Sequence, residues 1–186
     1  MTDYTYDLRI PKERVAVLIG KSGEVKKQIE QITKTKIEVD SKEGDVSVTG
    51  DDPITLLNVR EIIKAVGRGF NPDIALVLLK ADYSFELVNV ADYVRNKNDL
   101  IRIRGRVIGA EGKSRRTIEE LTETDICVFG KTIGIIGQLE NVALCRRAIM
   151  TLLSGSPHSS VYHWLEKKRA AMKRGSMIGD VKLDDD

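Results

Sequence analysis

Aromatic residues, cysteines and long apolar runs are all scarce in this chain of 186 residues. Aromatic residues make up 5% of it, too few for the base-stacking surfaces of an RRM or an OB-fold. The longest apolar run is the six residues Ile74 to Leu79, which is too short for a membrane span. The segment Met1 to Pro11 has no apolar core, so we expect no signal peptide. These absences predict a cytoplasmic protein.

The residues that usually carry metals or catalysis are equally rare. Cys127 and Cys145 are the only cysteines, and they fit neither a disulfide framework nor a CxxC metal site. His158 and His163 have no cysteine nearby, and no Ser-His-Asp or paired-carboxylate arrangement recurs in the chain. We therefore expect no cofactor, no metal and no enzymatic activity.

The chain instead repeats itself. Segment 17–23, VLIGKSG, is matched by segment 106–112, RVIGAEG, so that Gly20 and Gly109 lie 89 positions apart. The match continues for some fifty residues, with a shortening by two before the last strand. Because an internal duplication favours two small domains over one large domain, we predict two tandem domains.

Both copies follow one predicted path, β-α-α-β-β-α. In the first copy, apolar spacing and turn residues predict strands over 5–10, 36–39 and 46–49, and helices over 12–19, from Val25 to Ile32, and from Pro53 onward. In the second, we expect a strand over 84–90 and helices over 98–108, 113–122 and 140–153. The alternation of Ile and Arg over 101–104 would suit a strand, but its alignment to the first copy favours a helix.

These patterns divide the chain into four parts. The predicted boundaries are 1–68 for the first domain, 69–80 for a linker, 81–155 for the second domain, and 156–186 for a C-terminal segment. The linker is too hydrophobic for a flexible tether, so we expect a docking helix over 74–80. In the C-terminal segment we expect a basic helix over 161–174 and a frayed acidic tail from Met177.

The pattern I-G-x-x-G, followed by a helix and then T-x-T-x-I-x-V, resembles the KH domain in its type I arrangement, present here twice. The resemblance implies an α+β fold, with a three-stranded antiparallel sheet packed on three helices, and binding of single-stranded RNA or DNA. The segments around 67–79 and 155–162 are similar to one family of this kind, the archaeal tandem KH-domain rRNA-processing proteins. That family is related to the eukaryotic factor that accompanies the 3′ end of small-subunit rRNA to maturation.

The glycine loops are the predicted nucleic-acid contacts. Two glycines let the backbone turn tightly and approach a phosphodiester, while the next helix offers unpaired amides and the positive end of its dipole. The first loop and its flank comprise Gly20, Lys21, Ser22, Gly23, Lys26 and Lys27. The second loop comprises Gly109, Ala110, Glu111 and Gly112. The charge of Glu111 would oppose a nearby phosphate.

Beside the second loop, the resemblance implies an apolar groove that receives bases. It assigns four aliphatic residues to this groove: Ile108, Ile118, Ile126 and Val128. Backbone amides near the strand would read the Watson-Crick edges. The pattern alone favours an ordinary core position for each of these aliphatic residues, and only the family resemblance places them in a groove.

Charge distinguishes the two copies. Residues 1–68 hold 12 Lys and Arg against 12 Asp and Glu, whereas residues 101–153 hold 9 against 6. Five cations near the second loop are predicted phosphate contacts: Arg104, Arg106, Lys113, Arg115 and Arg116. We therefore predict that the second copy is the principal RNA site, and that the first copy supports it or docks a protein. A solvated charged face is the alternative for these cations.

A nucleotide-hydrolysing P-loop is the rival motif, because Gly20-Lys21-Ser22 and Gly112-Lys113-Ser114 resemble its end. That motif requires a glycine five positions before the final glycine, and Val15 and Val107 stand there instead. Nucleotide hydrolysis is therefore not predicted.

The expected function is to hold the 3′ region of precursor small-subunit rRNA during ribosome maturation. The resemblance also implies two protein partners, a PIN-domain endonuclease and the alpha subunit of translation initiation factor 2. The alternative is a KH-fold scaffold that binds a nuclease or an initiation factor and touches RNA little.

Overall fold

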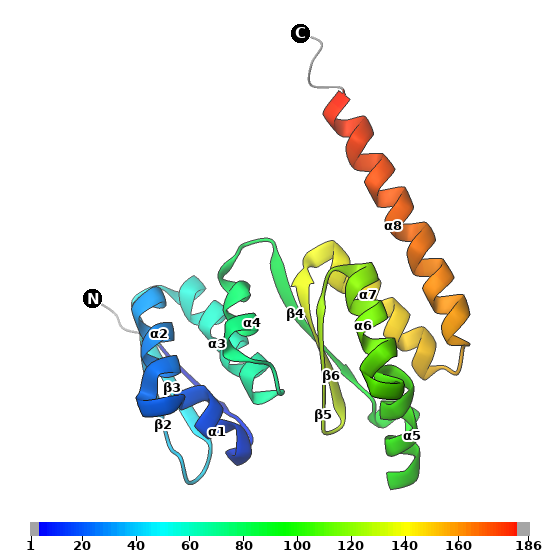
Figure 1. Cartoon of the computed structure of the whole chain (residues 1–186). Helices are drawn as coiled ribbons and strands as arrows, with labels where there is room; N and C mark the ends of the chain where they lie inside the picture. The colour runs from blue at the N-terminus through cyan, green and yellow to red at the C-terminus, as the bar shows by residue number, and fades with distance from the viewer. Residues whose placement is uncertain (1–3, 182–186) are drawn as a thin grey trace.

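The computed structural model describes residues 4–181 and contains two units of the same element order. The first unit comprises β1 (Tyr4–Arg9), α1 (Lys12–Ile19), α2 (Glu24–Thr33), β2 (Lys36–Val39), β3 (Asp45–Gly50) and α3 (Pro53–Gly67). The second comprises β4 (Tyr83–Asn89), α5 (Lys97–Ile108), α6 (Lys113–Thr122), β5 (Asp125–Phe129), β6 (Thr132–Gln138) and α7 (Leu139–Leu153). The predicted order β-α-α-β-β-α is confirmed in both copies (Figure 1).

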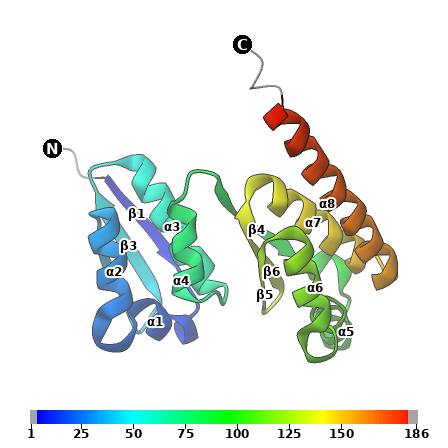
Figure 2. The same ribbon diagram turned by 45° about the horizontal axis from the view of Figure 1, so that its top comes forward.

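Each unit contains one antiparallel three-stranded sheet with its helices on one face (Figures 1 and 2). The strand orders are β1-β3-β2 and β4-β6-β5, which leaves β2 and β5 at sheet edges. Val48 lies opposite Ile37 in the first sheet, and Ile135 lies opposite Ile126 in the second. These four side chains face the helices and are almost fully buried, so equivalent positions form the two cores.

Helix α5 resolves the ambiguous Ile-Arg alternation. The Asn96 side chain accepts a hydrogen bond from the Asp99 amide at 2.9 Å and so caps the first turn of the helix. Ile103 and Val107, one helical turn apart, are both buried. A strand would place these two side chains on the same face as well, but it would not provide this cap. The helix prediction is confirmed.

Two predicted elements differ from the observed ones. The linker helix expected over 74–80 is instead a short α-helix, α4 (Pro72–Ala75), that tightens into a 3-10 helix, η2 (Leu76–Leu79). The C-terminal helix α8 (His158–Val181) begins earlier and continues further than predicted, so the frayed tail expected from Met177 is wrong as far as Val181. Residues 182–186 of that predicted tail lie outside the described residues.

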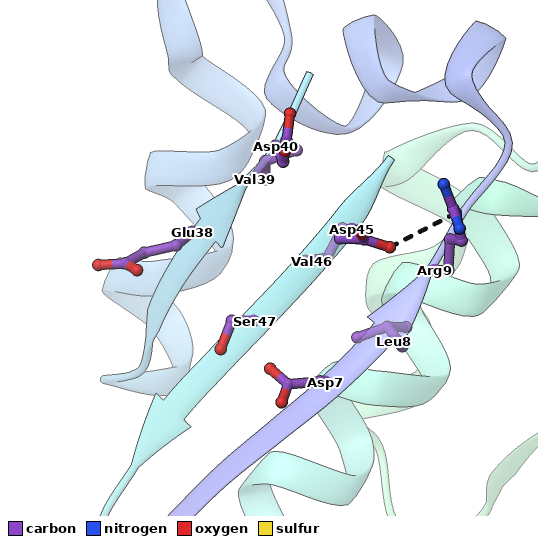
Figure 3. A pocket seen from close by; sticks show the side chains of 9 residues that line it. All are labelled: Asp7, Leu8, Arg9, Glu38, Val39, Asp40, Asp45, Val46 and Ser47. Atoms are coloured by element: carbon purple, nitrogen blue, oxygen red, sulfur yellow. Dashed lines mark ion pairs between the residues drawn. The ribbon is translucent and has the colours of Figure 1, made fainter. Parts of the chain in front are cut away.

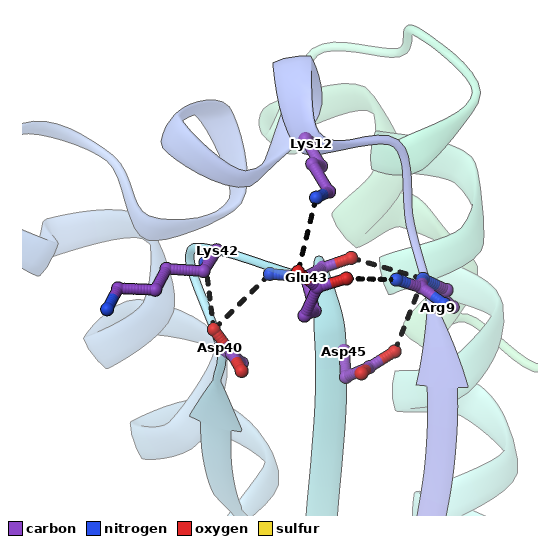
Figure 4. Close-up of polar contacts among 6 residues, drawn as sticks. All are labelled: Arg9, Lys12, Asp40, Lys42, Glu43 and Asp45. Carbon is purple, nitrogen blue, oxygen red and sulfur yellow. Dashed lines mark hydrogen bonds and ion pairs between the residues drawn. The ribbon is translucent and has the colours of Figure 1, made fainter.

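The outer face of the first sheet is polar. Its hollow is lined by charged side chains of all three strands (Figure 3). At its end, Arg9 pairs with Glu43 at 2.8 Å and Asp45 at 3.4 Å (Figure 4). These side chains are more than half exposed, and such pairs contribute little stability in water. We interpret this cluster as a solvated face.

The outer face of the second sheet is apolar and covered by the linker. Phe70 is 3% exposed and meets Phe85 of β4 edge-on, with ring centroids 5.9 Å apart. The space for Phe70 exists because Gly134 of β6 has no side chain, and a Cβ there would lie 2.5 Å from the Phe70 ring. Ile136 of β6 accordingly belongs to the same apolar cluster as the first unit's core. The two units therefore share one packed interface.

An arginine on the first helix of each unit binds the end of the last helix. Arg14 donates to the carbonyls of Val66 and Phe70, each at 2.8 Å. Arg106 donates to the carbonyls of Leu152 at 3.2 Å and Ser156 at 2.7 Å. The Val66 and Leu152 carbonyls also accept from the amides of Gly69 and Gly155, so each guanidinium adds a charged donor to a helix end and to the loop that follows it. The prediction that Arg106 contacts phosphate is corrected: its guanidinium is committed to the C-terminal end of α7.

We expect Gly134→Val to destabilise the protein by about 1–3 kcal/mol, the usual cost of overpacking a filled core. The added side chain would displace Phe70 and separate the linker from the second sheet. Urea unfolding measures this free energy. The matched control is Ser47→Val, since Ser47 occupies the equivalent place on the polar sheet face. Equal losses in the two variants would contradict the packing described for Phe70.

We expect Arg106→Ala to lower the free energy of unfolding by roughly 1.5–3 kcal/mol, because a charged donor is removed from partly buried carbonyls. The control is Arg102→Ala, whose side chain is 63% exposed and pairs only at the surface with Asp99. Thermal unfolding of both variants provides the comparison. If Arg106→Ala unfolds like wild type, the interaction with α7 contributes no stability.

Candidate nucleic-acid interface

The two glycine loops have almost the same backbone conformation. Gly20 and Gly109 have φ of 75° and 74°, and Gly23 and Gly112 have φ of 79° and 76°. These left-handed values favour glycine, since other residues are strained there. The first glycine is also fixed by packing, because a Cβ on Gly109 would lie 2.7 Å from the Cβ of Ser114. The repeated sequence therefore builds the same turn twice.

The second glycine of the second loop is open to solvent. A Cβ on Gly112 would have no heavy atom within 4 Å among its neighbours. Helix α6 begins at the next residue, and no side chain in the described part of the chain caps its first turn. Free amides and the positive end of the helix dipole therefore adjoin an unobstructed backbone. This arrangement is suited to an anion such as a phosphodiester.

Charge at this helix start differs between the copies. The residue that follows the second glycine is Glu24 in the first copy and the exposed Lys113 in the second. A cation favours phosphate at this position, while Glu24 repels it. Arg116 is exposed and donates to the carbonyl of Glu111 at 2.9 Å, which holds its guanidinium against the loop. Glu111 is itself exposed and remains the one opposing charge within the loop sequence.

The other predicted cations fall into two groups. Lys21 and Lys27 are exposed beside the first loop, and Arg104 is half-buried on α5. Lys26 and Arg115 are instead paired along their helices, with Glu30 at 3.8 Å and Glu119 at 3.6 Å. The exposed Lys21 and Lys27 are therefore available to a phosphate, whereas Lys26 and Arg115 are held by carboxylates of their own helices.

The predicted groove residues are only partly accessible. Ile108 on α5 and Val128 on β5 are half-buried, so part of each side chain can be reached by a ligand. Ile118 is completely buried and Ile126 is 4% exposed, and both belong to the core of the second unit. Their predicted contact with bases is corrected: they support the groove from beneath, because the helices already cover them.

A residue that the sequence interpretation missed lies at the edge of this groove. The backbone amide of Ile126, on the edge strand β5, donates to the Glu119 side chain at 2.8 Å. The first copy repeats the bond from Ile37 to Glu30 at 2.7 Å. Burial raises the pKa of Glu119 above its ordinary value, and the hydrogen bond from Ile126 and the charge of Arg115 offset only part of this rise. The signal in the sequence was a carboxylate four residues after a cation in both copies.

Other functional classes find little support in the geometry. No group of three or more His, Cys, Asp or Glu side chains within the described residues could hold a metal ion. Val15 and Val107, which stand where a P-loop needs glycine, are buried in the two cores. No helix in the described part of the chain is long and apolar enough to cross a membrane.

Comparison with known families assigns both units. Residues 84–170 match a family model described as a eukaryotic type KH-domain (KH-domain type I), and residues 5–66 match the KH domain model. The chain is 45% identical to a KH domain-containing protein of Methanocaldococcus jannaschii over 171 residues, which are 90% of this chain and 75% of that protein.

Two further relatives extend the comparison. The chain is 39% identical to the RNA-binding protein PNO1 of Oryzias latipes over 60% of its own length, but it spans only 46% of that protein. A chain in the crystal structure of an a/eIF2alpha-aDim2p-rRNA complex from Pyrococcus horikoshii is 42% identical, with a TM-score of 0.86, covering 91% of this chain and 96% of that one. With two KH units and these relatives, the chain belongs to the family of archaeal tandem KH-domain proteins that are homologous to the eukaryotic rRNA-processing protein PNO1.

Proposed function

We propose that this protein binds single-stranded RNA, and that it holds the 3′ region of precursor small-subunit rRNA during ribosome maturation. The observation that carries the proposal is the second glycine loop, where open backbone at Gly112 adjoins the uncapped start of α6. A KH loop of this kind clamps about four nucleotides through their backbone. The role is to bind and present RNA without covalent chemistry, in the cytoplasm where ribosomes mature.

The second unit is the principal site in this proposal. Lys113 and Arg116 supply positive charge at its loop, and the first unit has Glu24 at the corresponding helix start. Gly109 to Gly112 approach the phosphates, while Ile108 and Val128 line the groove that receives bases. Lys21, Lys27 and the first loop assist, because their backbone turn is the same.

Protein partners are the second part of the proposal. The structural relative from Pyrococcus horikoshii comes from a complex that contains a/eIF2alpha and rRNA. This supports the alpha subunit of translation initiation factor 2 as a partner of the present chain. The family resemblance supports a PIN-domain endonuclease, which would cut the RNA that this protein holds.

We expect Gly112→Asp to weaken binding of RNA from the 3′ end of small-subunit rRNA by roughly ten- to a hundredfold, the equivalent of losing one or two charge-assisted bonds. Its carboxylate would stand where a phosphate approaches. The matched control is Gly23→Asp, which places the same side chain at nearly the same φ in the first loop. Fluorescence anisotropy at several salt concentrations measures both variants.

The salt series separates the outcomes. For wild type, the logarithm of the affinity should fall with the logarithm of salt by about 0.7 for each phosphate contact with a single strand. A loss confined to Gly23→Asp would contradict the assignment of the principal site to the second unit. Wild-type binding that neither variant weakens would contradict the RNA clamp itself and favour the protein scaffold.

A further inference from the structure

Strand β5 lies at the edge of the second sheet, where the proposed function places a bound base. One backbone amide at this edge is already bound to a side-chain carboxylate. In an antiparallel pair, successive residues alternate between bonding the partner strand and facing outward. The Ile126 amide donates to Glu119 rather than to β6, so the backbone N–H of Ile126 points to the open edge while its side chain stays in the core. Two residues further on, Val128 faces the same open edge by this alternation. The strand thus presents one amide that is already bound to a carboxylate.

Both copies contain this arrangement. Glu30 accepts from the Ile37 amide at 2.7 Å, and Glu119 accepts from the Ile126 amide at 2.8 Å. In each case a cation lies one turn earlier on the same helix. The same bond between a carboxylate and an edge-strand amide therefore occurs in two units with different surface charge.

The Glu119 carboxylate is held from two sides and remains accessible. One oxygen accepts from Ile126, and the other lies 3.6 Å from Nε of Arg115. Its side chain is 22% exposed and that of Arg115 is 42% exposed. Arg115 Nε is itself buried and makes no hydrogen bond within the described part of the chain, so the exposed part of this side chain lies elsewhere on it. A partly exposed carboxylate and a partly exposed guanidinium therefore lie side by side next to the edge of β5.

We propose that Glu119 determines base specificity in this groove, by accepting a hydrogen bond from the exocyclic amino group of the bound base. The inference rests on the proposed RNA-binding function. Cytosine and adenine each present an amino donor beside a ring-nitrogen acceptor, which complements Glu119 beside Arg115. Uracil presents a carbonyl oxygen in place of the amino group of cytosine, so its lone pairs oppose the carboxylate. The site accordingly selects against uracil.

The variant Glu119→Gln tests this chemistry with little change of shape. Its amide oxygen can still accept from Ile126, while its NH₂ group replaces the outward acceptor with a donor. Binding is measured by fluorescence anisotropy with oligocytidine and oligouridine of equal length, each longer than the four-nucleotide footprint. Homopolymers are used because every register then presents the same base.

We expect wild type to prefer oligocytidine by about tenfold, within the usual discrimination of a base-reading contact. Glu119→Gln should abolish or reverse this ratio. The control Glu120→Gln removes the same charge from the adjacent, exposed residue, and should improve binding of both RNAs without changing their ratio. Because both RNAs have the same phosphates, the ratio should not depend on salt.

Three results would overturn the inference. If Glu119→Gln keeps the wild-type ratio, the carboxylate does not read the base. If Glu119→Gln tightens both RNAs equally and more than Glu120→Gln does, the carboxylate obstructs the edge instead of reading at it. If wild type binds neither RNA, the proposed function fails together with the inference, a result distinct from binding with an unchanged ratio. Melting temperatures of both variants establish that they are folded.

Discussion

The candidate site depends on a left-handed reversal of the backbone. Between α5 and α6 the chain turns through Gly109, Glu111 and Gly112, all with positive φ. This reversal lets α5 end at Ile108 and α6 begin at Lys113, and it leaves the first turn of α6 without a side-chain cap beside open backbone. The groove, the position of Lys113 and the proximity of Glu119 to the strand edge all follow from the direction that α6 takes out of this turn.

The duplication supplied two such turns, and a few substitutions then gave the copies different surroundings. Ser47 lies on the polar outer face of the first sheet, whereas its counterpart Gly134 admits Phe70 and joins the two units. At the helix start, Glu24 in one copy corresponds to Lys113 in the other. The second unit therefore combines the glycine turn with a charge that favours phosphate, while the first unit's core packs against the second sheet.

The element order of both units and their glycine loops could be predicted from the sequence, because each pattern of apolar residues and glycines occurs twice. The alternation of Ile and Arg over 101–104 locally resembles a strand, but alignment of the second copy to the first predicts the helix that the structure contains. Arg106 was misjudged since a cation beside a loop looks the same in sequence whether it faces solvent or the carbonyls of α7. For Glu119, the sequence shows only a carboxylate four residues after a cation, which indicates an ion pair along a helix and does not reveal the bond to a backbone amide seven residues away.

The most direct measurement is the change of backbone amide NMR signals when RNA from the 3′ end of small-subunit rRNA is added. We expect the largest changes at the lowest RNA concentration at Gly112, Lys113 and Val128. Signals of the first loop should change later and less. Changes confined to the polar face of the first sheet or to α8, with the signals of Gly112 and Lys113 unaltered, would show that the second glycine loop is not the RNA site.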